Sequence, residues 1–131
     1  MKCENCILVV EDDADLREAL TACLENAGCR TAVAVDGLDA LERLKDSPRP
    51  CLILVDVNMP RLDGDSFVRT LRKDERLRRI PLVSMSAGDR RLLPPLVHSH
   101  LDKPFEFAEL TAIVDRFCPN HRESAVGPCR T

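Results

Sequence analysis

The sequence predicts an α/β fold in which a doubly wound, five-stranded parallel sheet carries helices on both faces. Short apolar runs alternate along the chain with longer amphipathic stretches, and this alternation is typical of βαβ units. The apolar runs themselves contain almost no polar residues, as expected for strands that are buried on both faces. The length of 131 residues is that of one ordinary domain with a core of its own.

The predicted strands lie at residues 7–10, 31–35, 52–55, 82–85 and around 97–101. The predicted helices cover residues 14–27, residues 37–45, a segment after Gly64, and residues 107–117. Asp13 is a plausible N-cap of the first helix, and Gly28 a plausible stop at its end. Pro94 and Pro95 cut off the short helical stretch before the last strand, so we expect a shortened or irregular fourth helix.

Composition narrows the classes of function. A formal charge of −3 gives no basic surface for direct nucleic-acid binding. No apolar run approaches the length of a membrane span, and the first residues do not resemble a signal peptide, so we expect a cytoplasmic protein without membrane contact. Residues 1–118 are predicted to form the domain and residues 119–131 a disordered tail.

The chain has seven cysteines, which is an odd number. Cys23, Cys29 and Cys51 lie inside apolar patterns, where a free cysteine behaves as a small hydrophobic residue. We therefore expect these three to be reduced.

Four further groups, near the two ends of the domain, have the residue types and spacing of a structural zinc site. They are Cys3, Cys6, Cys118 and His121. Both segments are expected at the same end of the sheet, which would bring the four together. Free thiols in frayed termini, or a non-native disulfide, are the alternatives.

Polar residues follow four of the predicted strands, and in a parallel sheet such positions meet at one edge, where ligands bind. In chain order they are Glu11, Asp12 and Asp13, then Asp56, Ser86 and Lys103. Three carboxylates in one pocket repel one another, so either a proton or a cation must be present, and carboxylate oxygens suit Mg²⁺. With an ammonium and a hydroxyl added, the site could hold a phosphoryl group on one aspartate.

The chain resembles the receiver domains of two-component response regulators over residues 5–118. The matching stretches are ILVVEDD, LILVDVNMPRLDG, PLVSMSA and DKPF, in the family's order. The resemblance implies the flavodoxin-like (βα)5 receiver fold. It also implies phosphoryl transfer to an aspartate from a sensor histidine kinase or a histidine phosphotransfer protein.

Four positions match the acceptor and metal residues of that family. By this resemblance Asp56 is the phosphoacceptor, Asp12 binds Mg²⁺ (or Mn²⁺) directly, and Glu11 binds it through water. Asn58 is at the position whose backbone carbonyl completes the metal's coordination.

Four further positions match residues that contact the phosphoryl group or shape the site. Ser86 would hydrogen-bond a phosphoryl oxygen, Lys103 would pair with the phosphate, and Pro104 follows a peptide bond that is usually cis in this family. His100 stands where the family has its switch aromatic, a departure that, with Pro94 and Pro95, predicts altered output.

The predicted function is Mg²⁺-dependent phosphoryl acceptance on Asp56, with signalling through contacts with a downstream protein effector or output domain. The expected state is a monomer or a phosphorylation-linked dimer. The alternative is a degenerate receiver that acts as a phosphorylation-independent binding or dimerisation module. A phosphatase of the haloacid-dehalogenase type would need a second aspartate at position 58, which is Asn here, so no enzyme activity beyond slow self-dephosphorylation is expected.

Overall fold

A computed structural model describes residues 6–46, 50–56, 64–86 and 99–117. Five strands form one sheet in the order β2-β1-β3-β4-β5, and every neighbouring pair is parallel. The strands are β1 (Cys6–Val10), β2 (Arg30–Ala34), β3 (Leu52–Asp56), β4 (Leu82–Ser86) and β5 (Ser99–Asp102). The sheet therefore has the predicted parallel, doubly wound order.

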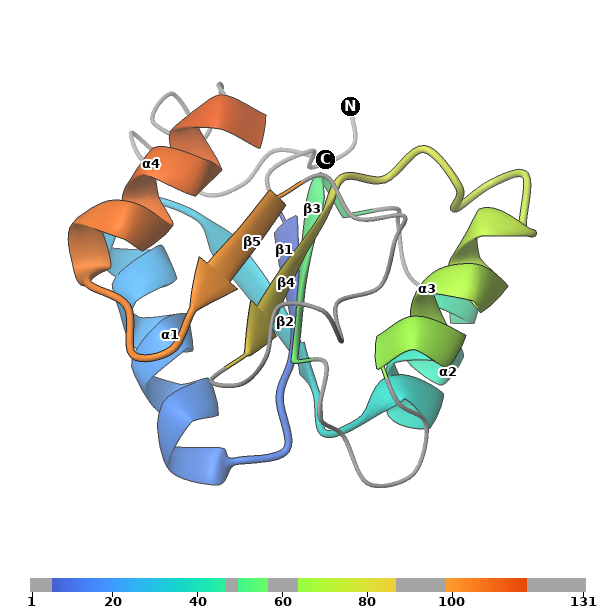
Figure 1. Cartoon of the computed structure of the whole chain (residues 1–131), viewed down its shortest axis with the longest axis horizontal. Helices are drawn as coiled ribbons and strands as arrows, with labels where there is room; N and C mark the ends of the chain where they lie inside the picture. The colour runs from blue at the N-terminus through green and yellow to red at the C-terminus, as the bar shows by residue number, and fades with distance from the viewer. Residues whose placement is uncertain (1–5, 47–49, 57–63, 87–98, 118–131) are drawn as a thin grey trace.

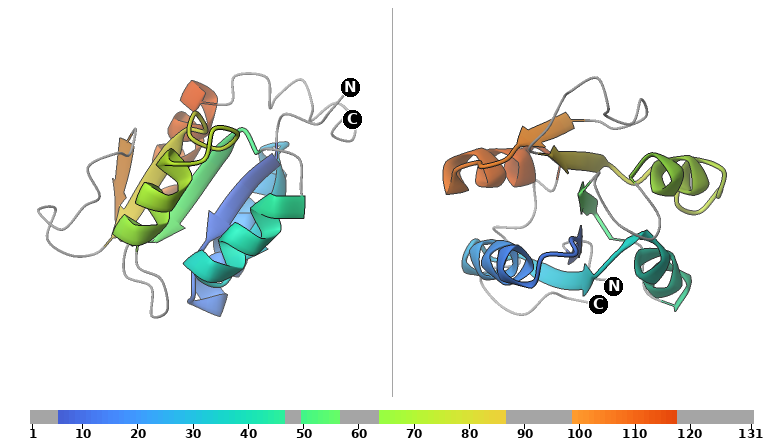
Figure 2. Two further views of the ribbon diagram at one scale, coloured as in Figure 1. Left: turned by 90° about the vertical axis from the view of Figure 1, so that its right-hand side faces the viewer. Right: turned by 60° about the horizontal axis from the view of Figure 1, so that its bottom comes forward.

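Within the described part of the chain, two helices cover each face of the sheet. These are α1 (Ala14–Asn26) and α4 (Phe107–Phe117) on one side, and α2 (Gly37–Asp46) and α3 (Gly64–Arg72) on the other. Figure 1 shows the pairs on the left and right of the strands, and Figure 2 shows the same three layers from two other directions. Among the described residues, no helix is both long and apolar enough to cross a bilayer.

The core has two parts, one on each face of the sheet. Helices α2 and α3 contribute the buried residues Ala40, Leu44, Phe67, Val68 and Leu71 to the first part. Helices α1 and α4 contribute Leu20, Leu24, Leu110 and Val114 to the second. Strand β3 lies at the centre and is buried along its whole length, including its last residue, Asp56. A carboxylate at that position needs partners, because burying a charge without them is unfavourable.

Local signals fix the start and end of α1. The side chain of Asp13 accepts hydrogen bonds from the backbone N–H groups of Asp15 (2.9 Å) and Leu16 (3.2 Å), as an N-cap does. The helix ends before Gly28, whose φ of 94° is in the left-handed region that glycine adopts without a steric penalty. Only residues 11–13 separate the end of β1 from the start of α1, so the Asp13 cap also helps to set the direction in which the chain leaves the sheet.

The predicted elements are close to the observed ones. Asp56 and Ser86 are the last residues of their strands, one position beyond the predicted ends. Cys23 and Cys29 are free thiols as expected, but the expectation for Cys51 was wrong, since Cys51 is disulfide-bonded. An apolar sequence pattern predicts burial of a cysteine but not its oxidation state. The predicted irregular helix around Pro94 and Pro95, and the predicted tail at 119–131, lie outside the described residues.

Replacing Asp13 with alanine should lower the free energy of unfolding by about 1 kcal/mol, because two backbone N–H groups of α1 lose their acceptor. The measurement is urea unfolding followed by circular dichroism, since the chain has no Trp or Tyr for fluorescence. Asp13→Asn is the matched control: it removes the same charge but keeps a good N-cap oxygen, and should stay close to wild type. Equal stabilities for the two variants would contradict a capping role.

Candidate functional site

The carboxyl ends of β1, β3, β4 and β5 meet at the lower edge of the sheet in Figure 1, which the right-hand view of Figure 2 brings forward. Glu11 follows β1, Asp56 ends β3, Ser86 ends β4 and Lys103 follows β5. All of these strands are parallel, so residues that are far apart in the sequence lie at one edge.

Three carboxylates form an acidic cluster at this edge. Glu11, Asp12 and Asp56 each place a carboxylate oxygen within 4.8 Å of those of the other two. Glu11 and Asp56 are buried, whereas Asp12 is exposed. Oxygen donors of this kind, with one side open to solvent, suit a hard divalent cation such as Mg²⁺.

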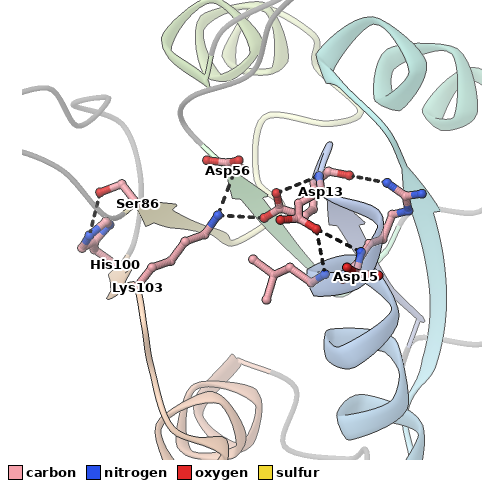
Figure 3. Close-up of polar contacts among 9 residues, drawn as sticks. Asp13, Asp15, Asp56, Ser86, His100 and Lys103 are labelled. Carbon is pink, nitrogen blue, oxygen red and sulfur yellow. Dashed lines mark hydrogen bonds and ion pairs between the residues drawn. The ribbon is translucent and has the colours of Figure 1, made fainter.

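Lys103 connects the end of β5 to the acidic cluster. Its Nζ lies 2.9 Å from Glu11 Oε1 and 3.5 Å from Asp56 Oδ2, and its side chain points toward Asp56 in Figure 3. Partial burial lowers the pKa of Lys103, but the hydrogen bond to Glu11 and the charges of Glu11 and Asp56 outweigh it, so the net pKa is raised. Lys103 is therefore a cation beside Asp56 at neutral pH.

Glu11 is held in place by its neighbours in the chain. Its Oε2 accepts from the N–H of Asp13 (3.2 Å), and its backbone carbonyl accepts from Arg17 Nη1 (2.8 Å). Its own N–H donates to the carbonyl of Ala34 (3.0 Å), at the end of β2. Burial raises the pKa of the Glu11 carboxyl to about 7, although the hydrogen bond from Lys103 acts in the opposite direction. Glu11 is thus a rigid carboxyl group whose charge needs a cation nearby.

On the β4–β5 side of the site, Ser86 contacts His100. Ser86 Oγ lies 3.4 Å from Nε2 of His100, and Figure 3 shows this pair beside Lys103. The same imidazole also contacts Ser84 Oγ through Nδ1 (2.8 Å) and Asp102 Oδ1 through Nε2 (3.0 Å). The peptide bond between Lys103 and Pro104 is cis.

The structure thus brings together Glu11, Asp12, Asp56, Ser86, His100 and Lys103. Asn58 lies outside the described residues. Of the four groups named for zinc, only Cys6 lies within the described residues, where it is a half-buried free thiol at the start of β1. The zinc hypothesis therefore stays a prediction, which no other finding supports.

Sequence reasoning missed Ser84 and Asp102 as partners of His100. Both lie an even number of residues from a predicted site residue in the same strand, so strand periodicity puts them on the same face. The strand register was the missing information: Ser84 is paired with His100, and Ser86 with Asp102.

Comparison with known proteins agrees with this fold. The family model of the response regulator receiver domain matches residues 7–115, and the chain belongs to this family. The receiver domain of a histidine kinase from Syntrophus aciditrophicus superposes with a TM-score of 0.82 and 31% identity, covering 88% of this chain and 91% of that one. The receiver domain of the sensor histidine kinase PA1611 from Pseudomonas aeruginosa gives a TM-score of 0.81 and 35% identity, covering 86% and 96%; magnesium is coordinated in its active-site cleft.

Curated relatives include proteins of different lengths. PilG of Pseudomonas aeruginosa is 29% identical over 119 residues, which is 87% of this chain and 87% of PilG. The transcriptional regulatory protein PrrA of Mycobacterium tuberculosis is 37% identical over 128 residues, which is 95% of this chain but 54% of PrrA. The sensor histidine kinase CheAY of Helicobacter pylori is 31% identical over 84% of this chain and 14% of its own length. The chain therefore spans most of PilG, about half of PrrA and a small part of CheAY.

Replacing Lys103 with methionine should destabilise the fold more at pH 8 than at pH 5. Lys103 lowers the pKa of Glu11, so without it the folded pKa rises further above about 7, while the unfolded pKa stays near its ordinary 4.5. A raised carboxyl pKa costs no stability below the unfolded value; the cost grows between the unfolded and the folded value and is constant above the folded value. Above both folded pKa values, each unit by which the variant's Glu11 pKa exceeds that of wild type enlarges the difference in free energy of unfolding by about 1.4 kcal/mol.

Urea unfolding at the two pH values measures this difference. Lys45→Met is the control, because Lys45 pairs with Glu42 on the surface, where both side chains are about 70% exposed, and its loss should have no comparable pH dependence. If Lys103→Met lost the same stability at both pH values, Lys103 would not be coupled to Glu11.

Proposed function

We propose that this receiver domain accepts a phosphoryl group on Asp56 in a Mg²⁺-dependent reaction. The observation that carries the proposal is that Lys103 contacts both Asp56 and Glu11 at the edge where the acidic cluster lies. An acidic cluster alone occurs on many surfaces. The ammonium of Lys103, held beside the buried carboxylate of Asp56, provides a positive charge that can attract an incoming anionic group.

In the proposed transfer, a carboxylate oxygen of Asp56 forms a bond to phosphorus as the bond from phosphorus to the donor group breaks. The donor is an imidazole nitrogen of a phosphohistidine, or the acyl oxygen of a small acyl phosphate, and it leaves with the bonding electron pair. Lys103 attracts the phosphoryl oxygens, on which negative charge is spread during transfer. Ser86, at the end of the neighbouring strand, can donate its hydroxyl hydrogen to one of them.

The carboxylates of Glu11, Asp12 and Asp56 fit a magnesium ion, and the backbone carbonyl of Asn58 is proposed as a further ligand. When bound, the ion would offset the charge that the carboxylates and the phosphoryl group bring together. Magnesium in the active-site cleft of the PA1611 receiver domain supports this assignment.

We infer that the phosphoryl donor is a sensor histidine kinase or a histidine phosphotransfer protein, since receiver segments similar to this chain occur within histidine kinases. The output would be a contact with an effector protein or an attached output domain, in the cytoplasm, with no chemistry beyond slow self-dephosphorylation. A degenerate, phosphorylation-independent receiver is not favoured, because the charged groups needed for phosphoryl transfer lie in contact.

Incubation with acetyl phosphate and Mg²⁺ should add one phosphoryl group to the wild-type chain, seen as an increase in intact mass. Asp56→Asn should give no adduct, because an amide oxygen is a poor nucleophile and cannot replace the carboxylate. Asp15→Asn is the matched control: Asp15 is an exposed aspartate of α1 outside the acidic cluster, and its variant should be phosphorylated like wild type. An equal adduct on Asp56→Asn, or none on wild type, would contradict the proposal.

Mg²⁺ should bind the unphosphorylated protein at the acidic cluster. In an NMR titration with MgCl₂, amide signals around Asp12 and Asp56 should shift, and Asp12→Asn should weaken binding by about tenfold or more, because an exposed ligand is lost. Asp15→Asn again serves as the control and should retain wild-type affinity. The same affinity in Asp12→Asn and wild type would remove Asp12 from the proposed ligands.

A further inference from the structure

The connection between α3 and β4 carries a local excess of positive charge. Residues 69–79 contain six cations and two anions, although the formal charge of the whole chain is −3. The cations are Arg69, Arg72, Lys73, Arg76, Arg78 and Arg79. The connection crosses the upper right of Figure 1, at the opposite end of the sheet from the acidic cluster. The molecule therefore has a positive end that its net charge does not reveal.

Hydrogen bonds to backbone carbonyl groups hold this connection against the rest of the domain. Arg72 Nη1 donates to the carbonyl oxygens of Arg78 and, at 3.3 Å, of Ile80. Arg76 Nη2 donates to the carbonyl oxygen of Leu44, near the end of α2. The side chain of Ile80 is buried in the part of the core that α2 and α3 cover. Because the connection is anchored in this way, its exposed side chains lose less backbone freedom when they bind a partner.

Three side chains of the connection are exposed cations, namely Lys73, Arg78 and Arg79. Within the described part of the chain, none of these three forms an ion pair with an acidic side chain. The neighbouring Asp74 instead accepts a hydrogen bond from the backbone N–H of Arg76 (2.8 Å). The charges of the three exposed cations are therefore available to a partner.

The dipole of α3 explains only some of the cations. Arg69 and Arg72 lie in the last turn of that helix, where positive charge is favourable by itself. Arg78 and Arg79 lie outside every described helix, beyond the reach of this effect. Like charges on adjacent residues repel each other, and an incoming anion would offset that repulsion. The two arginines thus have the properties of an anion-binding surface.

We propose that Lys73, Arg78 and Arg79 form a docking surface for an acidic segment of another protein. A guanidinium group donates two parallel hydrogen bonds to a carboxylate, so adjacent arginines suit a run of Asp and Glu side chains. Duplex nucleic acid and anionic membranes present wide negative surfaces, and they would be repelled by the rest of the chain, which is net negative outside residues 69–79. The inference goes beyond the proposed function and does not depend on it, because the acidic cluster lies at the other end of the sheet.

Fluorescence anisotropy with a short, labelled peptide of alternating Asp and Glu residues tests the docking surface on the whole chain. The double variant Arg78→Gln, Arg79→Gln should bind the peptide about tenfold more weakly than wild type, because two exposed ion pairs with the peptide are lost. The matched control is Arg30→Gln, Arg116→Gln, which removes two exposed cations from β2 and α4 and should keep wild-type affinity. Added salt should weaken the binding of wild type.

Several outcomes would overturn the proposal. An equal loss of affinity in the two double variants would mean that the peptide responds only to net charge. Absence of peptide binding to wild type at low ionic strength would remove the docking surface. Tighter binding of wild type to a DNA duplex, or to vesicles containing phosphatidylserine, would assign the surface to nucleic acid or to membrane. Self-association of wild type in sedimentation, lost in Arg78→Gln, Arg79→Gln, would make a second copy of this chain the occupant.

NMR locates the bound peptide and separates this proposal from the proposed function. Amide signals of residues 73–80 should shift on addition of the peptide, whereas shifts confined to the edge around Asp56 would contradict the docking surface. The Arg78→Gln, Arg79→Gln variant should form the acetyl phosphate adduct at the wild-type rate. No adduct on wild type would remove only phosphoryl acceptance, and no loss of peptide affinity in this variant would remove only the docking surface.

Discussion

The contact of Lys103 with Glu11 and Asp56 is the interaction on which the site depends. It joins the end of β5 to the ends of β1 and β3, and it places a cation beside two buried carboxylates. At the carboxyl edge of the sheet, the charge of Lys103 offsets part of the cost of removing these two negative groups from water. The same contact helps to stabilise Asp56 at the end of a buried strand, and it supplies the positive charge on which the proposed phosphoryl transfer depends.

The fold and most of the site follow from the order of residue types along the chain. Apolar runs alternating with amphipathic stretches indicated a parallel sheet, and the parallel sheet in turn brought Glu11, Asp12, Asp56 and Lys103 to one edge. The first step uses the periodicity of the sequence, which is local, and the second uses the rule that parallel strands bring their carboxyl ends to one edge. The N-cap at Asp13 and the left-handed Gly28 are local for the same reason.

Other features depend on information that no local pattern contains. The partners of His100 follow from the register of β5 against β4, which aligns Ser84 with His100, and a shift by one residue would turn these side chains to the other face. The disulfide of Cys51 depends on spatial proximity to another thiol, so an apolar sequence context could not reveal it. The pKa of Glu11 likewise depends on the degree of burial in the folded chain.

The strand order has a consequence for when the site exists. Lys103 and Glu11 are 92 residues apart in the sequence, and they meet only because β5 is added at one edge of a sheet whose central strand is β3. During synthesis, a chain that has not yet released β5 from the ribosome has Asp56 but lacks its ammonium partner. The contact that joins Lys103 to Glu11 and Asp56 is thus acquired only when β5 has joined the sheet, so the charge balance of this edge is completed late in synthesis.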